Sequence, residues 1–373
     1  MNKITKLILK FIVSDKTKFK RIESIIENKE KKSYIYAFGS ASVGGGSAVG
    51  DDNFFTAYYL KNDMPNKISR LKNGLDEVSK ATIDNFLKRT LLLPVGQVYT
   101  NFQVNKSFIR ALETPFEKKC RREYLKEHPS YLEKYKFIIP NKADNSIDKY
   151  VPNLENLNPD TFYFHHGLRF QSEKLKSYIK GKDFIDGGAF VGDSAIMLLS
   201  NYEPKQIFSF ELSEKNASYF ESNMRMNNIG EDKIKLVKLG LSDKKESILI
   251  DDIGGQSFGV FNKGENQASL TDLDSFAKEN NLHIGFIKTD LEGAGLKGLL
   301  GMKEVIERDR PVLSLAIYHT PEEFFEIVPT LREFAKNYKI KVVQLQVCAE
   351  KNTETAVFAY PKEIEEWYVY ERR

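Results

Sequence analysis

The pattern of hydrophobic and polar positions changes near the middle of the chain. After Gly181, short apolar runs alternate with longer stretches whose apolar residues keep a helical period. This alternation predicts crossover connections and a mostly parallel sheet with helices on both faces. The strands are expected at Asp183–Gly187, Gln206–Phe210, Ile234–Lys238, Gly285–Asp290, Pro311–Ile317, Ile340–Gln346 and Thr355–Tyr360. The helices are expected at Gly192–Ser200, Lys215–Asn227, Leu273–Asn280, Gly295–Glu307 and Glu322–Lys336.

The last two of these strands are separated by a short polar turn, Glu350–Thr353. Because so short a connection cannot carry a crossover, the two strands are expected to pair as an antiparallel hairpin. The sheet would then be mostly parallel, with an antiparallel hairpin at its C-terminal end.

In the first 160 residues, helical patterns outnumber strands. One helix is predicted over Ser69–Leu93, where Pro94 stops it, and another over Thr114–Lys136, with a break near Pro129. The polar, proline-containing stretch Asn141–Pro159 is typical of a linker or surface crossing. We therefore expect a mostly helical accessory, substrate-binding or oligomerisation region over residues 1–160, followed by an α/β domain over residues 161–373.

Two N-terminal segments allow more than one interpretation. Met1–Val13 is basic and apolar, but Lys6 and Lys10 interrupt it, which favours an amphipathic helix over a signal sequence. A short strand, Tyr34–Phe38, precedes a glycine-rich loop in which Ala41 stands where a dinucleotide fingerprint needs its middle glycine. We interpret this loop as a flexible segment near the active site or a subunit contact, with nucleotide binding as the alternative.

Composition narrows the function classes further. Hydrophobic residues make up 41% and charged residues 29%, as in an ordinary globular protein. The net charge of +4, from 56 basic and 52 acidic residues, predicts no nucleic-acid partner. The two cysteines, Cys120 and Cys348, lack metal-site spacing, and no apolar stretch is long enough for a membrane span, so we expect a reducing, cytoplasmic setting. Homo-oligomerisation stays open.

The turn after the first α/β strand is the clearest chemical motif. Asp186, Gly188 and Gly192 form the pattern Asp-x-Gly-x-x-x-Gly, and Gly187 adds freedom to the tight turn. A dinucleotide motif would place Ala189 where a pyrophosphate must approach the backbone. S-adenosylmethionine has no pyrophosphate, so this loop favours S-adenosylmethionine over a nicotinamide or flavin dinucleotide.

A carboxylate follows the second strand. Glu211 lies 19 residues beyond Gly192, close to where an acid that accepts the hydroxyls of a ribose is expected. After the third strand, Ser242 or Asp243 is a candidate for an adenine contact. The candidate cofactor-binding residues are Asp186, Gly187, Gly188, Ala189, Gly192, Asp193, Glu211, Leu212, Ser242, Asp243 and Asp290.

The ends of the fourth and fifth strands carry the candidate catalytic residues. Asp290 and Glu292 follow one strand, and Tyr318 and His319 follow the next. A hydroxyl becomes a good nucleophile when a base accepts its proton, and His319 titrates near neutral pH. Asp290 or Glu292 could serve instead if burial raises a carboxyl pKa. These three residues could also hold Mg²⁺ or Ca²⁺, but we expect no metal.

An aromatic segment with two histidines, FYFHHGLRF, precedes the first α/β strand at residues 162–170. Aromatic side chains pack well on the apolar faces of sugars, but such clusters more often form the core of a domain interface. His165 and His166, together with Tyr318, are therefore candidates for substrate binding.

Taken together, several motifs resemble the FkbM family of methyltransferases. They are FIDGGAFVGDSA, SFELSEKNASYFESNMRMNN, LDSF, IKTDLEGAG and AIYHTPEE, and they lie within residues 160–361. The resemblance implies a Rossmann-like fold and S-adenosylmethionine-dependent O-methylation of a sugar, glycan or related small molecule. It also maps cofactor binding onto Asp186, Gly188 and Glu211, and the reaction rim onto Asp290, Glu292 and His319.

One position departs from the family pattern. The family continues Asp-x-Glu-Gly-Ala with a second glutamate, whereas this chain has Gly295. If that glutamate caps a helix or orients substrate, the departure predicts altered specificity or reduced activity. It keeps open a catalytically idle scaffold, while Ala41 and Ala189 argue against a nucleotide-dependent oxidoreductase.

Overall fold

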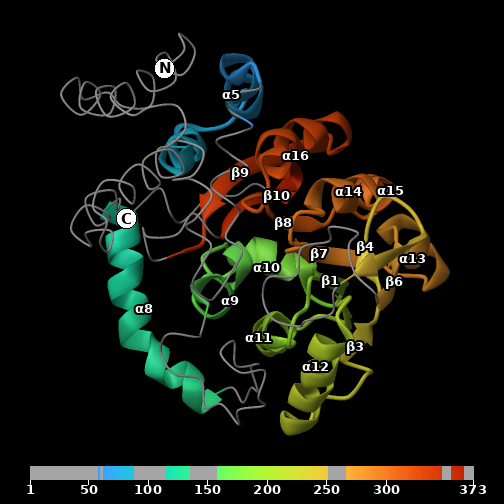
Figure 1. The fold of residues 1–373 in the computed structure, drawn as a ribbon. Coiled ribbons are helices and arrows are strands. Elements are labelled where there is room, and N and C mark those ends of the chain that lie inside the picture. The colour runs from blue at the N-terminus through green and yellow to red at the C-terminus, as the bar shows by residue number, and fades with distance from the viewer. Residues whose placement is uncertain are drawn as a thin grey trace, which may run out of the picture.

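The computed structural model describes residue 58 and residues 62–87, 115–134, 158–250, 266–346 and 354–364. A seven-stranded sheet in the order β3-β2-β1-β7-β8-β10-β9 forms its centre (Figure 1). Its strands are β1 Asp183–Gly187, β2 Ile207–Phe210, β3 Ile234–Val237, β7 Ile284–Thr289, β8 Val312–Ala316, β9 Tyr338–Gln344 and β10 Thr355–Pro361. The seven predicted strands are therefore confirmed, with ends shifted by at most a few residues.

The directions of the strands also match the expectation. β1 pairs in parallel with β2 and β7, β2 with β3, and β7 with β8. β10 is antiparallel to both β8 and β9, which confirms the C-terminal hairpin. All five residues of β1 are buried, as expected for a strand covered on both faces.

Helices cover both faces of the sheet because successive strand residues point to opposite sides. In β1, Phe184 packs into the core beneath one helix layer, and Ile185 packs into the core beneath the other. The first layer contains α10 Glu173–Ile179, α11 Asp193–Tyr202 and α12 Glu214–Met226. The second contains α13 Leu273–Glu279, α14 Gly295–Leu300, α15 Lys303–Asp309 and α16 Pro321–Phe334.

Local capping explains where several of these helices begin. The Ser213 side chain accepts a hydrogen bond from the Asn216 backbone N–H at the start of α12. Thr320 and Glu323 form a reciprocal capping box at the start of α16. These contacts satisfy backbone donors that a helix N-terminus otherwise leaves without a partner.

The predicted helix Gly295–Glu307 is wrong as a single element. It is divided into α14 and α15 at Gly301. A β-carbon at Gly301 would lie 1.9 Å from the Ser242 carbonyl oxygen, so two backbones approach closely at this junction. The helical period of the apolar residues does not reveal such an approach.

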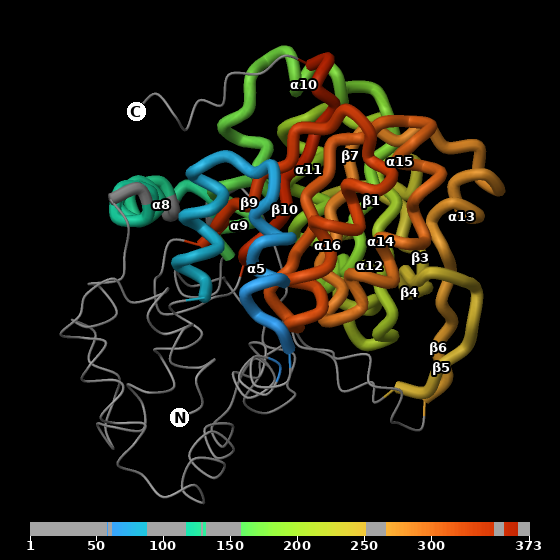
Figure 2. Tube along the Cα trace, turned by 90° about the horizontal axis from the view of Figure 1, so that it is seen from above, coloured from blue at the N-terminus to red at the C-terminus, as the bar shows by residue number. Residues whose placement is uncertain are grey.

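The predicted helix Ser69–Leu93 is also two helices. α5, Met64–Lys72, ends before Gly74, which has a left-handed φ of +66°, and a second helix covers 77–87. Both pack on the second helix layer, where Lys67 Nζ lies 2.6 Å from Glu326 Oε1 of α16. Figure 2 shows α5 beside α16. This part of the N-terminal region therefore shares a hydrophobic core with the sheet.

The expected break near Pro129 does not occur. α8 runs without interruption over Pro115–Lys134, although proline removes one helical hydrogen bond. Around this position the Ser130 hydroxyl donates to the Glu127 carbonyl oxygen at 2.6 Å, and Arg169 donates to both Glu127 and Tyr131. The local Ser130 bond and the two tertiary contacts of Arg169 stabilise the helix around the proline.

Several short elements were not predicted. A second sheet has the order β4-β6-β5, and short helices precede β1 and follow β10. The motifs Met1–Val13 and Tyr34–Phe38 lie outside the described residues. Among the described helices, none combines the length and apolarity needed to cross a bilayer. The additional elements are β4 Gly240–Leu241, β5 Glu246–Ile250, β6 Asn266–Thr271, α9 Pro159–Phe162, η1 His165–Gly167 and η2 Lys362–Ile364.

Candidate functional site

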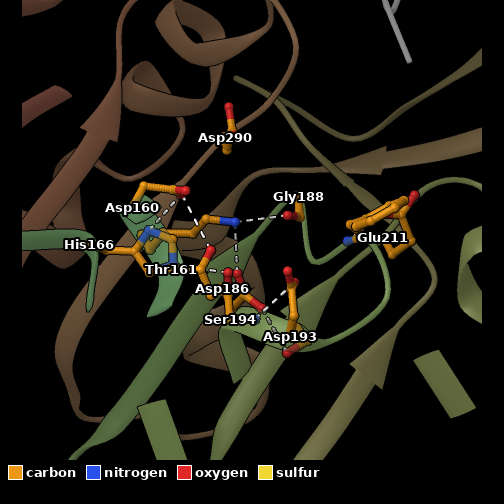
Figure 3. Close-up of polar contacts among 12 residues, drawn as sticks. Asp160, Thr161, His166, Asp186, Gly188, Asp193, Ser194, Glu211 and Asp290 are labelled. Carbon is orange, nitrogen blue, oxygen red and sulfur yellow. Dashed lines mark hydrogen bonds and ion pairs between the residues drawn. The ribbon is translucent and has the colours of Figure 1, made fainter. Parts of the chain in front are cut away.

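The carboxyl ends of the parallel strands meet at one edge of the sheet. Asp186 lies at the end of β1, Glu211 follows β2, Asp290 follows β7, and His319 lies shortly after β8. Figure 3 shows Asp186 in a group of polar side chains, with Glu211 to one side and Asp290 above it. Ligands of open α/β sheets bind at this edge, so the fold itself brings the predicted residues together.

Two glycines of the loop after β1 are required by its geometry. Gly188 has a φ of +76°, and a β-carbon there would lie 2.0 Å from the Asp290 carbonyl oxygen. Gly192 has a φ of +84°, and its β-carbon would lie 2.5 Å from Met224 Cε and 2.9 Å from Phe220 Cδ2. The absence of a side chain at Gly192 therefore lets α12 pack closely against the turn into α11.

A buried ion pair, missed by the sequence analysis, supports the same loop. Lys288 Nζ of β7 lies 3.0 Å from Asp186 Oδ1 and donates to the Gly188 carbonyl oxygen at 2.8 Å. Burial alone would lower the pKa of Lys288, but Asp186 and Asp290 raise it above its ordinary value. The lysine therefore stays cationic and ties the end of β1 to β7. In the sequence, this ion pair is indicated only by a lysine within the otherwise apolar strand FIKT.

Glu211 is a buried carboxylate held by backbone donors. Its Oε2 accepts from the Phe190 N–H at 2.7 Å, and its Oε1 accepts from the Ser213 N–H at 2.9 Å and from Asn216 Nδ2 at 3.4 Å. Burial raises the pKa of Glu211 to about 7, although these donors act in the opposite direction. Asp193, in the first turn of α11, is also buried, and burial raises its pKa to about 6.

The candidate adenine-contact residues lie around β4. A β-carbon at Gly240 would lie 3.2 Å from Leu212 Cδ1, so the end of β2 is next to β4. Ser242 is buried and its hydroxyl donates to Asp243 Oδ1 at 3.1 Å, whereas Asp243 is exposed. Leu212 and Ser242 therefore both lie next to β4.

His319 lies among three carboxylates. Its Nε2 is 3.1 Å from Asp290 Oδ1 and 3.4 Å from Glu292 Oε2, and its Nδ1 is 3.7 Å from Glu323 Oε2. Burial would lower the pKa of His319, but Asp290 and Glu292 raise it well above its ordinary value. The ring is therefore an imidazolium at neutral pH. Burial raises the pKa of Glu292, which also adopts a left-handed φ of +49°.

Tyr318 joins this cluster through its hydroxyl. The hydroxyl oxygen lies 3.3 Å and 3.4 Å from the two carboxylate oxygens of Asp290 and 3.4 Å from Glu354 Oε1. Glu354, just before β10, was not predicted because its place depends on the hairpin. Burial, with Asp160 and Asp290 nearby, raises the pKa of Glu354 well above its ordinary value.

The two neighbouring histidines face different surroundings. His166 Nε2 lies 2.9 Å from Ser194 Oγ, and its Nδ1 lies 3.6 Å from Asp160 Oδ2 (Figure 3). Burial lowers the pKa of His166 well below its ordinary value, so the ring is neutral. His165 Nδ1 instead lies 2.7 Å from the Tyr202 hydroxyl at the end of α11. Only His166 therefore joins the polar group at the end of β1.

Asp160 is a second acid that the sequence analysis missed. It lies in α9, and burial, with Asp290 and Asp193 nearby, raises its pKa to about 7. Because α9 precedes the sheet in sequence, no strand-end motif indicates that Asp160 reaches this edge.

A carboxylate from another helix lies next to Gly295, the position that departs from the family pattern. The Gly295 N–H, in the first turn of α14, donates to Glu323 Oε1 at 2.7 Å. Glu323 is buried in the first turn of α16. The α14 N-terminus is thus capped by a glutamate, although that glutamate comes from α16.

Comparisons with known proteins agree with this arrangement. Residues 186–340 match the family model of the methyltransferase FkbM domain. A search of curated proteins finds no match to the chain. The crystal structure of an FkbM methyltransferase from Methylobacillus flagellatus KT is similar, with a TM-score of 0.52 and 14% identity. That similarity covers 84% of this chain and 62% of the other, so this chain spans less than two thirds of that protein.

Two more distant structures are similar over half of this chain. A putative rRNA methylase from Clostridium thermocellum has a TM-score of 0.35 and 12% identity, covering 50% of this chain and 90% of that one. A putative methyltransferase from Streptococcus mutans in complex with SAH has a TM-score of 0.35 and 14% identity, covering 50% and 93%. The FkbM methyltransferase structure, with its TM-score of 0.52, shows the fold of this chain.

The family match supports S-adenosylmethionine as the cofactor, and the residues present fit it. A carboxylate can accept about four hydrogen bonds, and the Glu211 carboxylate accepts three from the protein, one of them long, so it retains capacity for a ribose hydroxyl. The loop after β1 contains the two left-handed glycines Gly188 and Gly192, which let the chain turn sharply into α11.

Proposed function

We propose that this chain, whose residues 186–340 match the family model of the methyltransferase FkbM domain, methylates a hydroxyl group of a sugar, glycan or related small molecule. The observation that carries the proposal is the cluster of Asp290, Glu292 and His319 at the carboxyl edge of the sheet. The cluster combines two carboxylates that can accept a proton with the positively charged ring of His319, and it lies beside the loop that would bind the cofactor.

S-adenosylmethionine supplies a methyl group on a positively charged sulfur. Methyl transfer to oxygen is an in-line displacement, so the protein contributes mainly by positioning the two reactants and by removing the hydroxyl proton. Because both ring nitrogens of protonated His319 already carry a proton, a carboxylate is the better proton acceptor. We assign this role to Glu292, whose pKa burial raises, with His319 and Asp290 orienting it.

The remaining predicted residues divide into two groups. Asp186, Gly188, Asp193 and Glu211 would hold the cofactor, with Leu212 and Ser242 near the adenine. His166, Tyr318 and the newly identified Asp160 would contact the acceptor, whereas His165 is turned towards α11. We further propose that residues 1–160 complete the acceptor site or form a subunit contact, that the acceptor is not a nucleic acid, and that the compartment is cytoplasmic, as charge and cysteine content suggest.

The test is an assay of S-adenosylhomocysteine formation with a panel of sugars, glycans and hydroxylated metabolites. For an accepted substrate, Glu292→Gln should lower kcat by about 100-fold or more, with S-adenosylhomocysteine affinity unchanged. Glu322→Gln, an exposed glutamate of α16, is the matched control and should retain activity. Cofactor binding without methyl transfer to any class would instead support a catalytically idle scaffold.

A further inference from the structure

Asp290, Glu292 and His319 converge from two neighbouring strands. β7 and β8 are parallel, and Thr289, the last residue of β7, is paired with Leu315 of β8. The residues that follow these strands therefore lie on the same edge. Among the described residues, one ligand atom from each of the three lies within 4.8 Å of the others.

The two distances from His319 Nε2 to the carboxylates are close to those between ligands around one metal ion. Metal bonds of about 2.1 Å that meet at right angles place neighbouring ligand atoms about 3.0 Å apart. His319 Nε2 lies 3.1 Å from Asp290 Oδ1 and 3.4 Å from Glu292 Oε2. A small closing movement of the two carboxylates would complete this geometry.

The imidazole gives an independent indication. His319 is 7% exposed, yet neither of its ring nitrogens makes a hydrogen bond of acceptable geometry. Buried polar atoms of native proteins nearly always have such a partner. Since Nε2 is directed at the two carboxylates, a metal cation held jointly by the three side chains would take the place of the ring proton there.

The neighbours of His319 and Asp290 are also those that metal-binding side chains usually contact. Metal-binding histidines usually direct their other ring nitrogen at a carboxylate or carbonyl, and Glu323 Oε2 lies 3.7 Å from His319 Nδ1. Ligating carboxylates are likewise hydrogen-bonded, and the Tyr318 hydroxyl lies 3.3 Å from Asp290 Oδ1.

From this geometry we infer that Asp290, Glu292 and His319 bind a divalent transition-metal cation. Two carboxylates and one imidazole suit Mn²⁺ better than Mg²⁺, which prefers oxygen ligands. Three protein ligands leave positions open for an acceptor, and a hydroxyl bound to the cation would pass its proton more readily to the Glu292 oxygen that does not bind the cation. This role in catalysis rests on the proposed function, whereas the binding site itself does not.

The test uses the full-length chain, treated with a chelator and titrated with MnCl₂ without cofactor or acceptor. Electron paramagnetic resonance of the free aquated ion measures binding, and we expect one Mn²⁺ per chain. Pulsed measurements on the bound ion should show nitrogen hyperfine coupling from one imidazole. His319→Gln and Asp290→Asn should each weaken binding by at least about tenfold, and His319→Gln should abolish the coupling.

His283→Gln is the matched control. His283 Nδ1 lies 3.2 Å from Asp309 Oδ1, but that histidine is largely exposed and makes only a pairwise contact with one acid. Its variant should bind Mn²⁺ like the parent protein. The inference is overturned if the parent chain binds no Mn²⁺, or if bound Mn²⁺ lacks nitrogen coupling. Because the coupling is measured on the parent chain, the test holds even if a variant fails to fold. Absence of methyl transfer with intact Mn²⁺ binding would contradict the proposed function alone.

Discussion

Glu323 performs the helix-capping role that a glutamate at position 295 would otherwise have. α14 contains no acidic residue in its first turn, and its Gly295 N–H is satisfied by Glu323 Oε1 at 2.7 Å. A β-carbon at Gly295 would lie 2.6 Å from the same oxygen, so the two side chains compete for one space. Gly295 and Glu323 should therefore be energetically coupled, and exchanging the carboxylate between the two positions tests this.

The expected magnitudes follow from these contacts. Glu323→Ala removes a capping box, at a cost of about 1 kcal/mol, and leaves the buried Gly295 N–H without an acceptor, at a further cost of about 1–3 kcal/mol. Gly295→Glu alone forces a second carboxylate against Glu323, which should cost about 1–3 kcal/mol. In the double variant the new side chain occupies the vacated space, where an acid favours the helix N-terminus. The double variant should therefore lose less free energy of unfolding than the two single variants together, by at least about 1 kcal/mol.

Urea denaturation followed by circular dichroism measures these free energies of unfolding, with S-adenosylhomocysteine binding as a check on the native state. Glu322→Ala, which removes an exposed acid from the same helical turn, is the control and should be additive with Gly295→Glu. The predicted coupling would be refuted if the double variant lost as much free energy of unfolding as Gly295→Glu and Glu323→Ala together, within about 0.5 kcal/mol.

Two further predictions concern the cofactor loop. Gly188→Ala should lower the free energy of unfolding by about 3 kcal/mol or more in thermal or urea unfolding, because left-handed strain adds to a clash with the Asp290 backbone. The control Gly181→Ala, with a similar φ of +73° and open space around it, should cost only about 1–2 kcal/mol. Equal losses for the two variants would contradict the clash. Because burial raises the pKa of Glu211 to about 7, its contribution to stability is present below the unfolded pKa and is lost as pH rises towards 7. Calorimetric affinity for S-adenosylhomocysteine should change in the opposite direction and fall about tenfold per pH unit below 7, because the ionised carboxylate accepts the ribose hydroxyls. A flat profile would contradict the combination of a raised Glu211 pKa with a role as ribose acceptor.

The sequence predicts the sheet well because its signal is local. Strands buried on both faces are short continuous apolar runs, and their order along the chain implies which ends meet. The proximity of Asp290 and His319 follows from that rule. The contacts of Lys288 and Glu323 do not, because each lies in an otherwise regular element and its partner comes from elsewhere in the fold. The same limit explains the division of α14 from α15, where the cause is a carbonyl of Ser242.

The pKa values of buried acids shift in opposite directions at the two ends of the sheet. This difference distinguishes a structural role from a functional one. At the amino end, Asp309 accepts from the Ile284 N–H and from Arg308, and although burial would raise its pKa, these partners lower it. At the carboxyl end, burial instead raises the pKa of Glu211 and Glu292. A buried acid whose charged form is disfavoured lowers the stability of the fold near neutral pH, and an apolar replacement is often neutral or better. The group at the carboxyl end is therefore best explained by the proton transfer and ligand binding that it would perform.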